Sequence, residues 1–160
     1  MPRRRPMEIF EADLSAAADV ARLMSALNSA VGPVYGLPAT PENTVVTAKQ
    51  ARQRMEAMAS VERVLLADVD GERIGLLSLR IVPYLSQDVP YAEVTELFVS
   101  ETHRRRGIAK AMIERAEQIA REARCTLIHM NAWHNNDAAK DFYRSAGFDA
   151  VEVGFKKLVR

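Results

Sequence analysis

The chain has 160 residues, of which 48% are hydrophobic and 27% charged, and its 22 Lys and Arg nearly balance its 21 Asp and Glu. This composition excludes collagen-like, low-complexity and disordered classes. It predicts one globular domain over residues 1–160 that can fold without a disulfide or a metal. A net charge of +1 gives no reason to expect a nucleic-acid or membrane-surface protein. A single cysteine and no apolar stretch of membrane length predict a soluble, cytoplasmic protein.

The first 60 residues predict a strand followed by two helices. Met7–Glu11 has an extended pattern, and Asp13 or Ser15 can cap a helix that runs to about Ala30. Glycines and prolines then predict a loop, after which Thr47–Met58 has the pattern of a second helix. The loop-forming residues are Gly32, Pro33, Gly36, Pro38 and Pro41.

The middle of the chain predicts three strands and a helix. Asp70-Gly71 lies between the apolar runs Val64–Val69 and Arg73–Leu79, which is a strong hairpin signal. A further strand is expected over Tyr91–Val99, after a loop. Gly107 then opens a helix whose apolar residues recur every three or four positions.

The last 35 residues predict a strand, a helix and two more strands. Thr126–Met130 is the strand, and Asn135 or Asn136 can cap a helix that Gly147 ends. Strands that alternate with helices but include a hairpin indicate a mixed sheet, hence an α/β or α+β fold. The two C-terminal strands are expected around Phe148–Val153 and Phe155–Val159.

An arginine-glycine turn between a predicted strand and a predicted helix is the most informative segment. Free N–H groups and the positive end of the helix dipole bind phosphate oxygens. Gly107 and Ala109 allow close approach, while four cations stand where they are disfavoured without an anion: Arg104, Arg105, Arg106 and Lys110. Taken alone, the turn is also explained as a solvated arginine turn. A contact with DNA phosphates is disfavoured, because the net charge is only +1 and no nucleic-acid-binding module is recognisable. Neither G-x-x-x-x-G-K-[ST] nor a strand-linked G-x-G-x-x-G occurs.

Three segments in order resemble the GCN5-related N-acetyltransferase (GNAT) family, whose members transfer an acetyl group from acetyl-CoA. Ala92–Val99 is similar to the family's A-E-x-x-E-L-x-V strand, and Arg104–Ala109 to its Q/R-x-x-G-x-G/A pyrophosphate loop. Asn136–Phe148 resembles N-x-x-A-x-x-F-Y-x-x-x-G-F, the most specific of the three. The resemblance spans roughly residues 61–148, and the order of expected elements is also the family's.

The resemblance implies the acyl-CoA N-acyltransferase (GNAT) fold: a mixed, mostly antiparallel central sheet flanked by helices, in one GNAT-like domain over residues 1–160. Ala109 replaces a commoner glycine, and Arg105 stands where glycine is frequent in the family. Backbone N–H groups of the arginine turn would bind the pyrophosphate of acetyl-CoA, and the preceding strand would pair with the pantetheine arm. Asn136 would contact that arm or cap its helix. The implied cofactor-binding residues are Leu97, Phe98, Val99, Arg104, Arg105, Arg106, Gly107, Ile108, Ala109, Lys110, Asn136 and Tyr143.

The chemistry of such a transfer requires a proton acceptor, because an alkyl amine with a pKa of about 10.4 is only about 0.04% neutral at pH 7. Glu93 and Glu96 are the candidates, directly or through water. Three positions apart on a regular strand they face opposite sides, unless a bulge intervenes, as the family often has there. By resemblance, the Tyr143 hydroxyl donates to the leaving sulfur. The resemblance also implies that a backbone N–H near Leu97 or Phe98 stabilises the oxyanion.

The remaining polar residues predict no metal site. His103, His129 and His134 have no ligand spacing, and Cys125 is expected to be a buried small hydrophobe. Trp133 has no assigned role. The loop before the family strand has acidic and aromatic residues suited to a cationic acceptor, namely Tyr84, Asp88 and Tyr91.

These expectations leave the acceptor open among small amines, amino acids, aminoglycosides and protein amines. A non-catalytic CoA-binding or sensor domain is the alternative function. An arginine-rich nucleic-acid adaptor is a third hypothesis, and its binding would depend steeply on salt. Neither nucleic acid nor a membrane is the expected partner. Homodimers are common in the family, although nothing in the sequence specifies an interface.

Overall fold

A five-stranded sheet organises the computed structural model, which describes residues 6–32, 40–157 and 159. The strands are arranged in chain order, with the first four antiparallel and the fifth parallel to the fourth. The mixed, mostly antiparallel sheet expected from the sequence is therefore confirmed. The strands are β1 (Glu8–Glu11), β2 (Glu62–Val69), β3 (Glu72–Val82), β4 (Tyr91–Val99) and β5 (Ile128–Met130).

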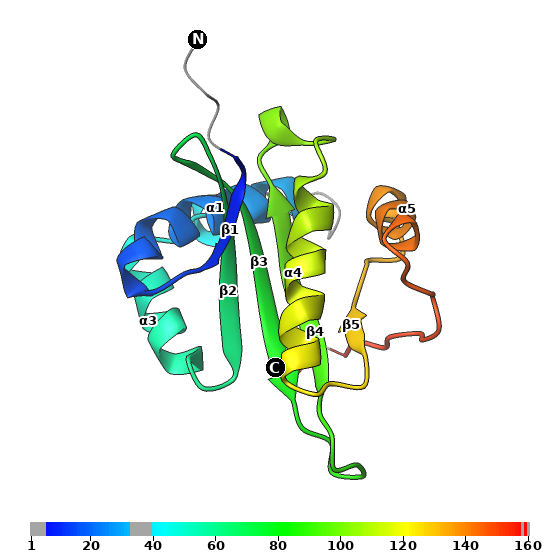
Figure 1. Cartoon of the computed structure of the whole chain (residues 1–160). Helices are drawn as coiled ribbons and strands as arrows, with labels where there is room; N and C mark the ends of the chain where they lie inside the picture. The colour runs from blue at the N-terminus through cyan, green and yellow to red at the C-terminus, as the bar shows by residue number, and fades with distance from the viewer. Residues whose placement is uncertain (1–5, 33–39, 158, 160) are drawn as a thin grey trace.

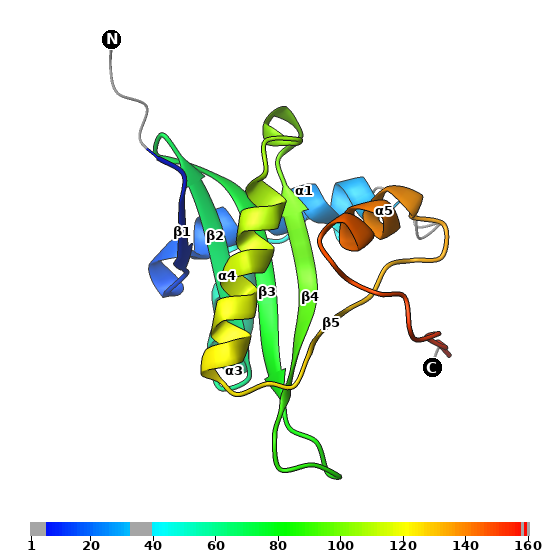
Figure 2. The same ribbon diagram turned by 45° about the vertical axis from the view of Figure 1, so that its right-hand side comes forward.

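Helices cover both faces of this sheet (Figures 1 and 2). On one face lie α1 (Ala17–Val31) and α3 (Ala48–Met58), and on the other lies α4 (Ile108–Glu122). The last helix, α5 (Asp137–Ser145), lies on the β5 side of the sheet, level with the carboxyl end of β4. None of the described helices is long and apolar enough to cross a membrane. Three short helical segments complete the fold: η1 (Leu14–Ala16), α2 (Pro41–Thr44) and η2 (Glu101–His103).

Local sequence signals explain where most elements begin. Asp13 accepts a hydrogen bond of 2.8 Å from the Ser15 N–H and so caps η1, which leads into α1. Thr47 and Gln50 form a complete capping box at α3. At the β2–β3 turn, Asp70-Gly71 has the positive φ angles, 54° and 89°, that a two-residue hairpin requires.

Two apolar layers hold the helices on the sheet. On the α4 side, fully buried residues of the helix pack against inward-facing residues of β2, β3 and β4. On the opposite side, Leu23 and Leu27 of α1 pack with Leu66, Leu76 and Phe98. Because side chains alternate along a strand, membership of these two layers shows which face each β4 residue occupies.

The prediction of two C-terminal strands is wrong for the described residues, because residues 148–157 form no strand. Residue 158 lies outside the described residues. Val151, Val153 and Phe155 are 79%, 80% and 95% exposed. The edge strand β5 has only three residues, so it offers few backbone groups with which a sixth strand could pair. Gly154 in the middle of the segment weakens its strand preference further.

Two smaller differences concern element boundaries. Pro41, expected in a loop, begins α2, where a first-turn proline needs no N–H partner. The strand expected over Thr126–Met130 begins only at Ile128. The Thr126 N–H bonds instead to the Pro90 carbonyl at 3.0 Å, before the regular ladder starts. The rest of the expected loop, residues 33–39, lies outside the described residues.

Candidate active site

The turn between β4 and α4 presents backbone N–H groups that have no hydrogen-bond partner among the described residues. Gly107, at φ 77°, is the N-cap of α4, and the first helical bond runs from the Ala111 N–H to its carbonyl at 3.0 Å. The N–H groups of residues 108–110 therefore have no partner within the helix. No side chain caps this helix, and its first turn has no acidic residue. The start of α4 is thus electrostatically suited to an anion.

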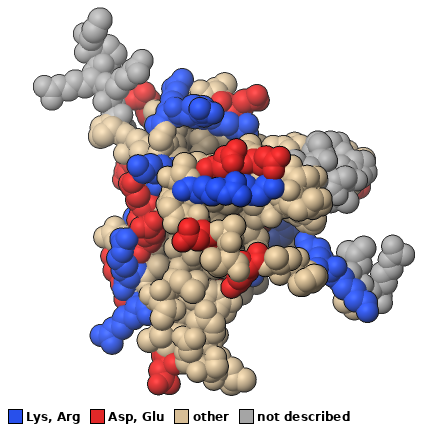
Figure 3. Space-filling model, turned by 90° about the vertical axis from the view of Figure 1, so that its right-hand side faces the viewer, with Lys and Arg blue, Asp and Glu red and all other residues tan. Residues whose placement is uncertain are grey.

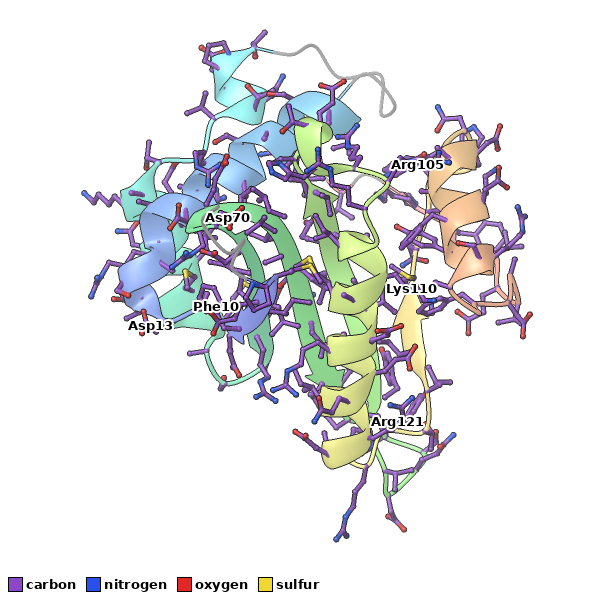
Figure 4. The ribbon with its side chains drawn as sticks, turned by 45° about the horizontal axis from the view of Figure 1, so that its top comes forward. Phe10, Asp13, Asp70, Arg105, Lys110 and Arg121 are labelled. Atoms are coloured by element: carbon purple, nitrogen blue, oxygen red, sulfur yellow. The ribbon has the colours of Figure 1, made fainter. Side chains whose placement is uncertain are left out.

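The three arginines of this turn do not act alike. Arg104 donates from Nε to the Val99 carbonyl at 3.1 Å, and its guanidinium lies 5.8 Å from the centre of the Phe98 ring. It therefore ties the turn to the end of β4. Arg105, Arg106 and Lys110 are exposed, and Figure 4 shows Arg105 and Lys110 at the start of α4, on the side of α5.

Positive charge gathers at this end of the molecule. Figure 3, which views the α5 side, shows basic side chains at its upper end, over the loop between β4 and α4.

Arg105 has a left-handed φ of 64°, a conformation that costs a side-chain-bearing residue free energy. This conformation explains why glycine is favourable at that position.

Within the described part of the chain, the β5-facing edge of β4 has a strand partner only along its first half. β5 pairs only with Ala92–Val94, and the two strands then diverge (Figure 2). Leu97, Phe98 and Val99 pair with β3 on their other side. This free edge fits an extended chain with amide groups, such as the pantetheine arm of acetyl-CoA. At Gly107 an added Cβ would meet no atom within 4 Å, so the turn is open to a phosphate group.

A bulge in β4 brings the two candidate carboxylates to one face of the sheet. Ser78 pairs with Glu96 and the next residue of β3 with Val94, so Thr95 is an extra residue. Val94 belongs to the core layer beneath α4, whereas Phe98 belongs to the opposite layer. Glu93 and Glu96 consequently both face the α1–α3 side, because the extra residue of the bulge turns positions that lie three apart to the same face.

A polar cluster beside these carboxylates was missed in the sequence analysis. Glu62 of β2 accepts hydrogen bonds from the Ser78 hydroxyl, from the Thr95 hydroxyl at 3.0 Å and from Arg80 Nε at 2.8 Å. The signal was present in β3, where Ser78 and Arg80 interrupt an apolar run at alternate positions on the same face. Their partner on β2 could not be identified without the strand register.

Burial and neighbouring charge act on Glu96. Desolvation raises the pKa of its carboxyl above the ordinary value, the charge of Glu62 raises it further, and Arg80 lowers it. Glu93 lies 3.9 Å from His129 Nδ1, while His129 Nε2 lies 3.2 Å from Glu152. The face therefore has more carboxylates than cations, which suits a positively charged acceptor.

The last helix contains the other predicted residues. Asn136 accepts a hydrogen bond of 3.1 Å from the Ala139 N–H, which confirms its role as N-cap; its contact with a cofactor stays a prediction. The Tyr143 ring lies 5.8 Å from that of Phe142 and 6.3 Å from that of Phe148. Phe142 and Phe148 pack against the core beneath α4.

Other singled-out residues lie near or away from this face. The rings of Tyr84 and Tyr91 lie 4.7 Å apart between centres and are tilted by 41°, and Tyr91 precedes Glu93 by two positions on the same strand. Cys125 is half-buried against the core, and burial raises the pKa of its thiol, which disfavours a nucleophilic thiolate. Among the described residues, no group of His, Cys, Asp and Glu is arranged to hold a metal ion.

A family comparison explains these features together. The sequence pattern of the acetyltransferase (GNAT) family matches residues 35–148, which is more than half of the chain. The chain belongs to the GNAT family. The resemblance of the β4 strand, the arginine turn and the α5 segment is thereby confirmed.

GNAT relatives are found by sequence and by structure. Over 81 residues the chain is 31% identical to an uncharacterized N-acetyltransferase in the pepI 3' region of Lactobacillus delbrueckii subsp. lactis, covering 49% of this chain and 47% of the relative. The match thus spans about half the length of that curated relative.

Two solved structures share the GNAT fold. A ribosomal-protein-alanine N-acetyltransferase of Brucella melitensis biovar Abortus 2308 superposes with a TM-score of 0.77 at 20% identity, covering 98% of this chain and 99% of the other. An aminoglycoside acetyltransferase, meta-AAC0020 from an uncultured soil metagenomic sample, does so with a TM-score of 0.78 at 18% identity, covering 96% and 97%.

Proposed function

We propose that this GNAT protein is an acetyl-CoA-dependent N-acetyltransferase in which a primary amine attacks directly in a ternary complex. The observation that carries the proposal is the form of β4. Its β5-facing edge is free beyond Val94, and its bulge turns two carboxylates onto one face. One strand thus supports both cofactor binding and proton removal.

The start of α4 binds the cofactor's pyrophosphate. The N–H groups of Ile108, Ala109 and Lys110 donate to phosphate oxygens, and the exposed Arg105 and Arg106 add attraction at longer range. The free edge formed by Leu97, Phe98 and Val99 pairs with the pantetheine arm, and Asn136, the N-cap of α5, contacts that arm. When bound, acetyl-CoA supplies an activated acetyl thioester.

Glu96 is the proton acceptor. A general base works best when its pKa approaches the working pH, and burial raises the pKa of Glu96 in that direction. Directly or through one water, its carboxylate takes the proton that the acceptor ammonium must lose before attack. Glu93, on the same face of the sheet, attracts the ammonium.

Tyr143 supports departure of the thiolate. Its hydroxyl donates a hydrogen bond to the leaving sulfur, and a neighbouring N–H of β4 near Leu97 or Phe98 stabilises charge on the carbonyl oxygen. Packing of its ring between Phe142 and Phe148 restricts its orientation.

The acceptor is a cationic amine. Excess carboxylates on the α1–α3 side and the neighbouring rings of Tyr84 and Tyr91 favour a positively charged molecule. Structures of similar fold have names that include an aminoglycoside and a ribosomal-protein alanine as acceptors, so the fold alone does not choose between small and protein amines. A CoA-binding domain without turnover has no use for a buried carboxylate, and this alternative is not favoured.

A thiol-release assay with a panel of amines tests the proposal. Wild type should release CoA only when an acceptor is present, and Glu96→Gln should lower kcat by about 10² or more, the usual contribution of a general base. Glu72→Gln, which changes an exposed carboxylate at the other end of β3, is the matched control. Unchanged turnover in Glu96→Gln would exclude this residue as the base.

A further inference from the structure

The hydrogen bonds around the β4 bulge involve a buried carboxylate that touches neither the acceptor nor the cofactor in the proposed function. We propose that Glu62 is a positioning residue, which fixes the bulge at Thr95 and thereby aims Glu96 at the acceptor amine. This inference rests on the proposed function, because it assigns the support of the base that function requires.

Glu62 ties three strands together at one point. Its side chain is only 9% exposed. One oxygen accepts from the hydroxyls of Ser78 and Thr95, and the other accepts from Arg80 Nε. Ser78 is the direct partner of Glu96 across the β3–β4 ladder, and Thr95 is the extra residue of the bulge. The conformation of β4 next to Glu96 is therefore coupled to a carboxylate on β2.

The cost of burying Glu62 argues for a specific role. An ionised carboxylate loses hydration in the interior and is tolerated there only when it is paired and fully hydrogen-bonded. Arg80, its partner, is 40% exposed, so most of the desolvation falls on Glu62. A plain β-sheet face needs no such group, whereas the hydroxyl of the half-buried Thr95 needs an acceptor: it bonds to Glu62 at 3.0 Å and lies 3.5 Å from the Ser78 carbonyl.

Glu62 also sets the electrostatic surroundings of the base. Among the described residues, the charged groups that act on Glu96 are Glu62 on β2 and Arg80 on β3. Glu93 acts on the same Arg80, with His129 of β5 beside it. The inner surfaces of α1 and α3 on this side are apolar. The charge of Glu62 disfavours ionised Glu96, in addition to burial, and Arg80 opposes it.

Titration of Glu96 by carbon-13 NMR tests the charge effect. The signal is identified by its loss in Glu96→Gln. Glu62→Gln should move the titration of Glu96 to lower pH, because a like charge is removed and Arg80 is released. Arg80→Gln should move it to higher pH, and the control Glu72→Gln should leave it unchanged. Equal titration curves in wild type, Glu62→Gln and Arg80→Gln would overturn the proposal.

Two substitutions at the bulge test the positioning effect. Thr95→Val keeps the shape of the side chain but loses the hydroxyl bond to Glu62, and kcat should fall about tenfold with little change in the KM for acetyl-CoA. Thr95→Ser keeps the hydroxyl and should retain wild-type kcat. A valine variant with wild-type kcat, or a serine variant as impaired as valine, would contradict the role.

The two readouts separate this inference from the proposed function. The titration of Glu96 needs no turnover, so it decides the role of Glu62 even if no amine is acetylated. If no amine is acetylated but the titration of Glu96 shifts in Glu62→Gln, the proposed function is refuted and the coupling between Glu62 and Glu96 is not. Full transfer with a titration indifferent to Glu62 would refute the coupling alone.

Discussion

A single extra residue, Thr95, determines how Glu93 and Glu96 are used. Without it, two residues three positions apart on a strand would face opposite layers, and one carboxylate would enter the apolar core beneath α4. With it, both carboxylates lie on the α1–α3 face, where Glu93 pairs across the ladder with Arg80 and Glu96 with Ser78. Glu96 is half-buried there, and its raised pKa follows mainly from lost hydration.

This burial predicts a stability cost at neutral pH. The pKa of Glu96 is raised from the ordinary 4.5, so between 4.5 and the raised value the folded state binds more protons than the unfolded state. The contribution of Glu96 to the free energy of unfolding is therefore fully present below pH 4.5. It is lost as the pH rises through the pKa that Glu96 has in the folded state. Glu96→Gln should melt at a higher temperature than wild type at pH 7, with the gain shrinking below pH 4.5. A less stable variant at pH 7 would contradict the assignment.

The Tyr143 hydroxyl should affect catalysis. Tyr143→Phe keeps the ring that packs against Phe142 and Phe148, and thermal melting reports any effect on folding separately. The kcat should fall by about 10², because the leaving thiolate loses its donor, and the KM for acetyl-CoA should stay nearly constant. Thiol-release kinetics and thermal melting measure these effects. A Tyr143→Phe variant with the kcat of the wild type would show that the hydroxyl has no role in catalysis.

Close packing of α4 on the sheet places the anion-binding turn. A helix can lie this near to β3 because Gly75 has no side chain: an added Cβ would come within 2.9 Å of Met112 Sδ and 3.2 Å of Ala67 Cβ. Met112 itself is fully buried. The start of α4 is thereby held beside the end of β4, where the Arg104 bond to Val99 adds a second tie.

Overpacking at this contact should destabilise the protein. Gly75→Ala should lower the free energy of unfolding by about 1–3 kcal/mol, since the core must shift to admit one methyl group. Gly154→Ala, at an exposed glycine with no atom within 4 Å of the added Cβ, should change it by less than about 0.5 kcal/mol. Urea denaturation compares the two. Equal stability of the two variants would show that α4 has room above Gly75.

For the molecule as a whole, local signals predicted the elements well and long-range contacts poorly. Asp70-Gly71 indicated the hairpin, Thr47 and Asn136 the starts of two helices, and the period of three and four residues the α4 core. Each of these signals depends on neighbours within a few positions of the chain. The fold and family followed because three short motifs occur in order.

The parts that could not be predicted depend on partners distant in sequence. The cluster around Glu62 is formed by residues from three strands and requires the register between them. The alternation of Val151, Val153 and Phe155 indicates a strand, yet a strand forms only beside a partner edge, and β5 is too short to provide one. Local pattern describes what a segment can adopt, and tertiary contacts decide what it does adopt.

The central claim is that the turn between β4 and α4 binds acetyl-CoA, and calorimetric titration tests it most directly. Wild type should show saturable binding in the micromolar range. Gly107→Glu should abolish it by placing a carboxylate against the pyrophosphate. Gly71→Glu is a matched control, because Gly71 also has a positive φ and open space around an added Cβ, in the distant β2–β3 turn.

The two glutamate variants incur similar backbone strain, so a difference between them reports the binding site and not folding. The account predicts wild-type affinity in Gly71→Glu and no measurable binding in Gly107→Glu. Equal binding in both variants, or a wild type that binds no acetyl-CoA, would contradict it.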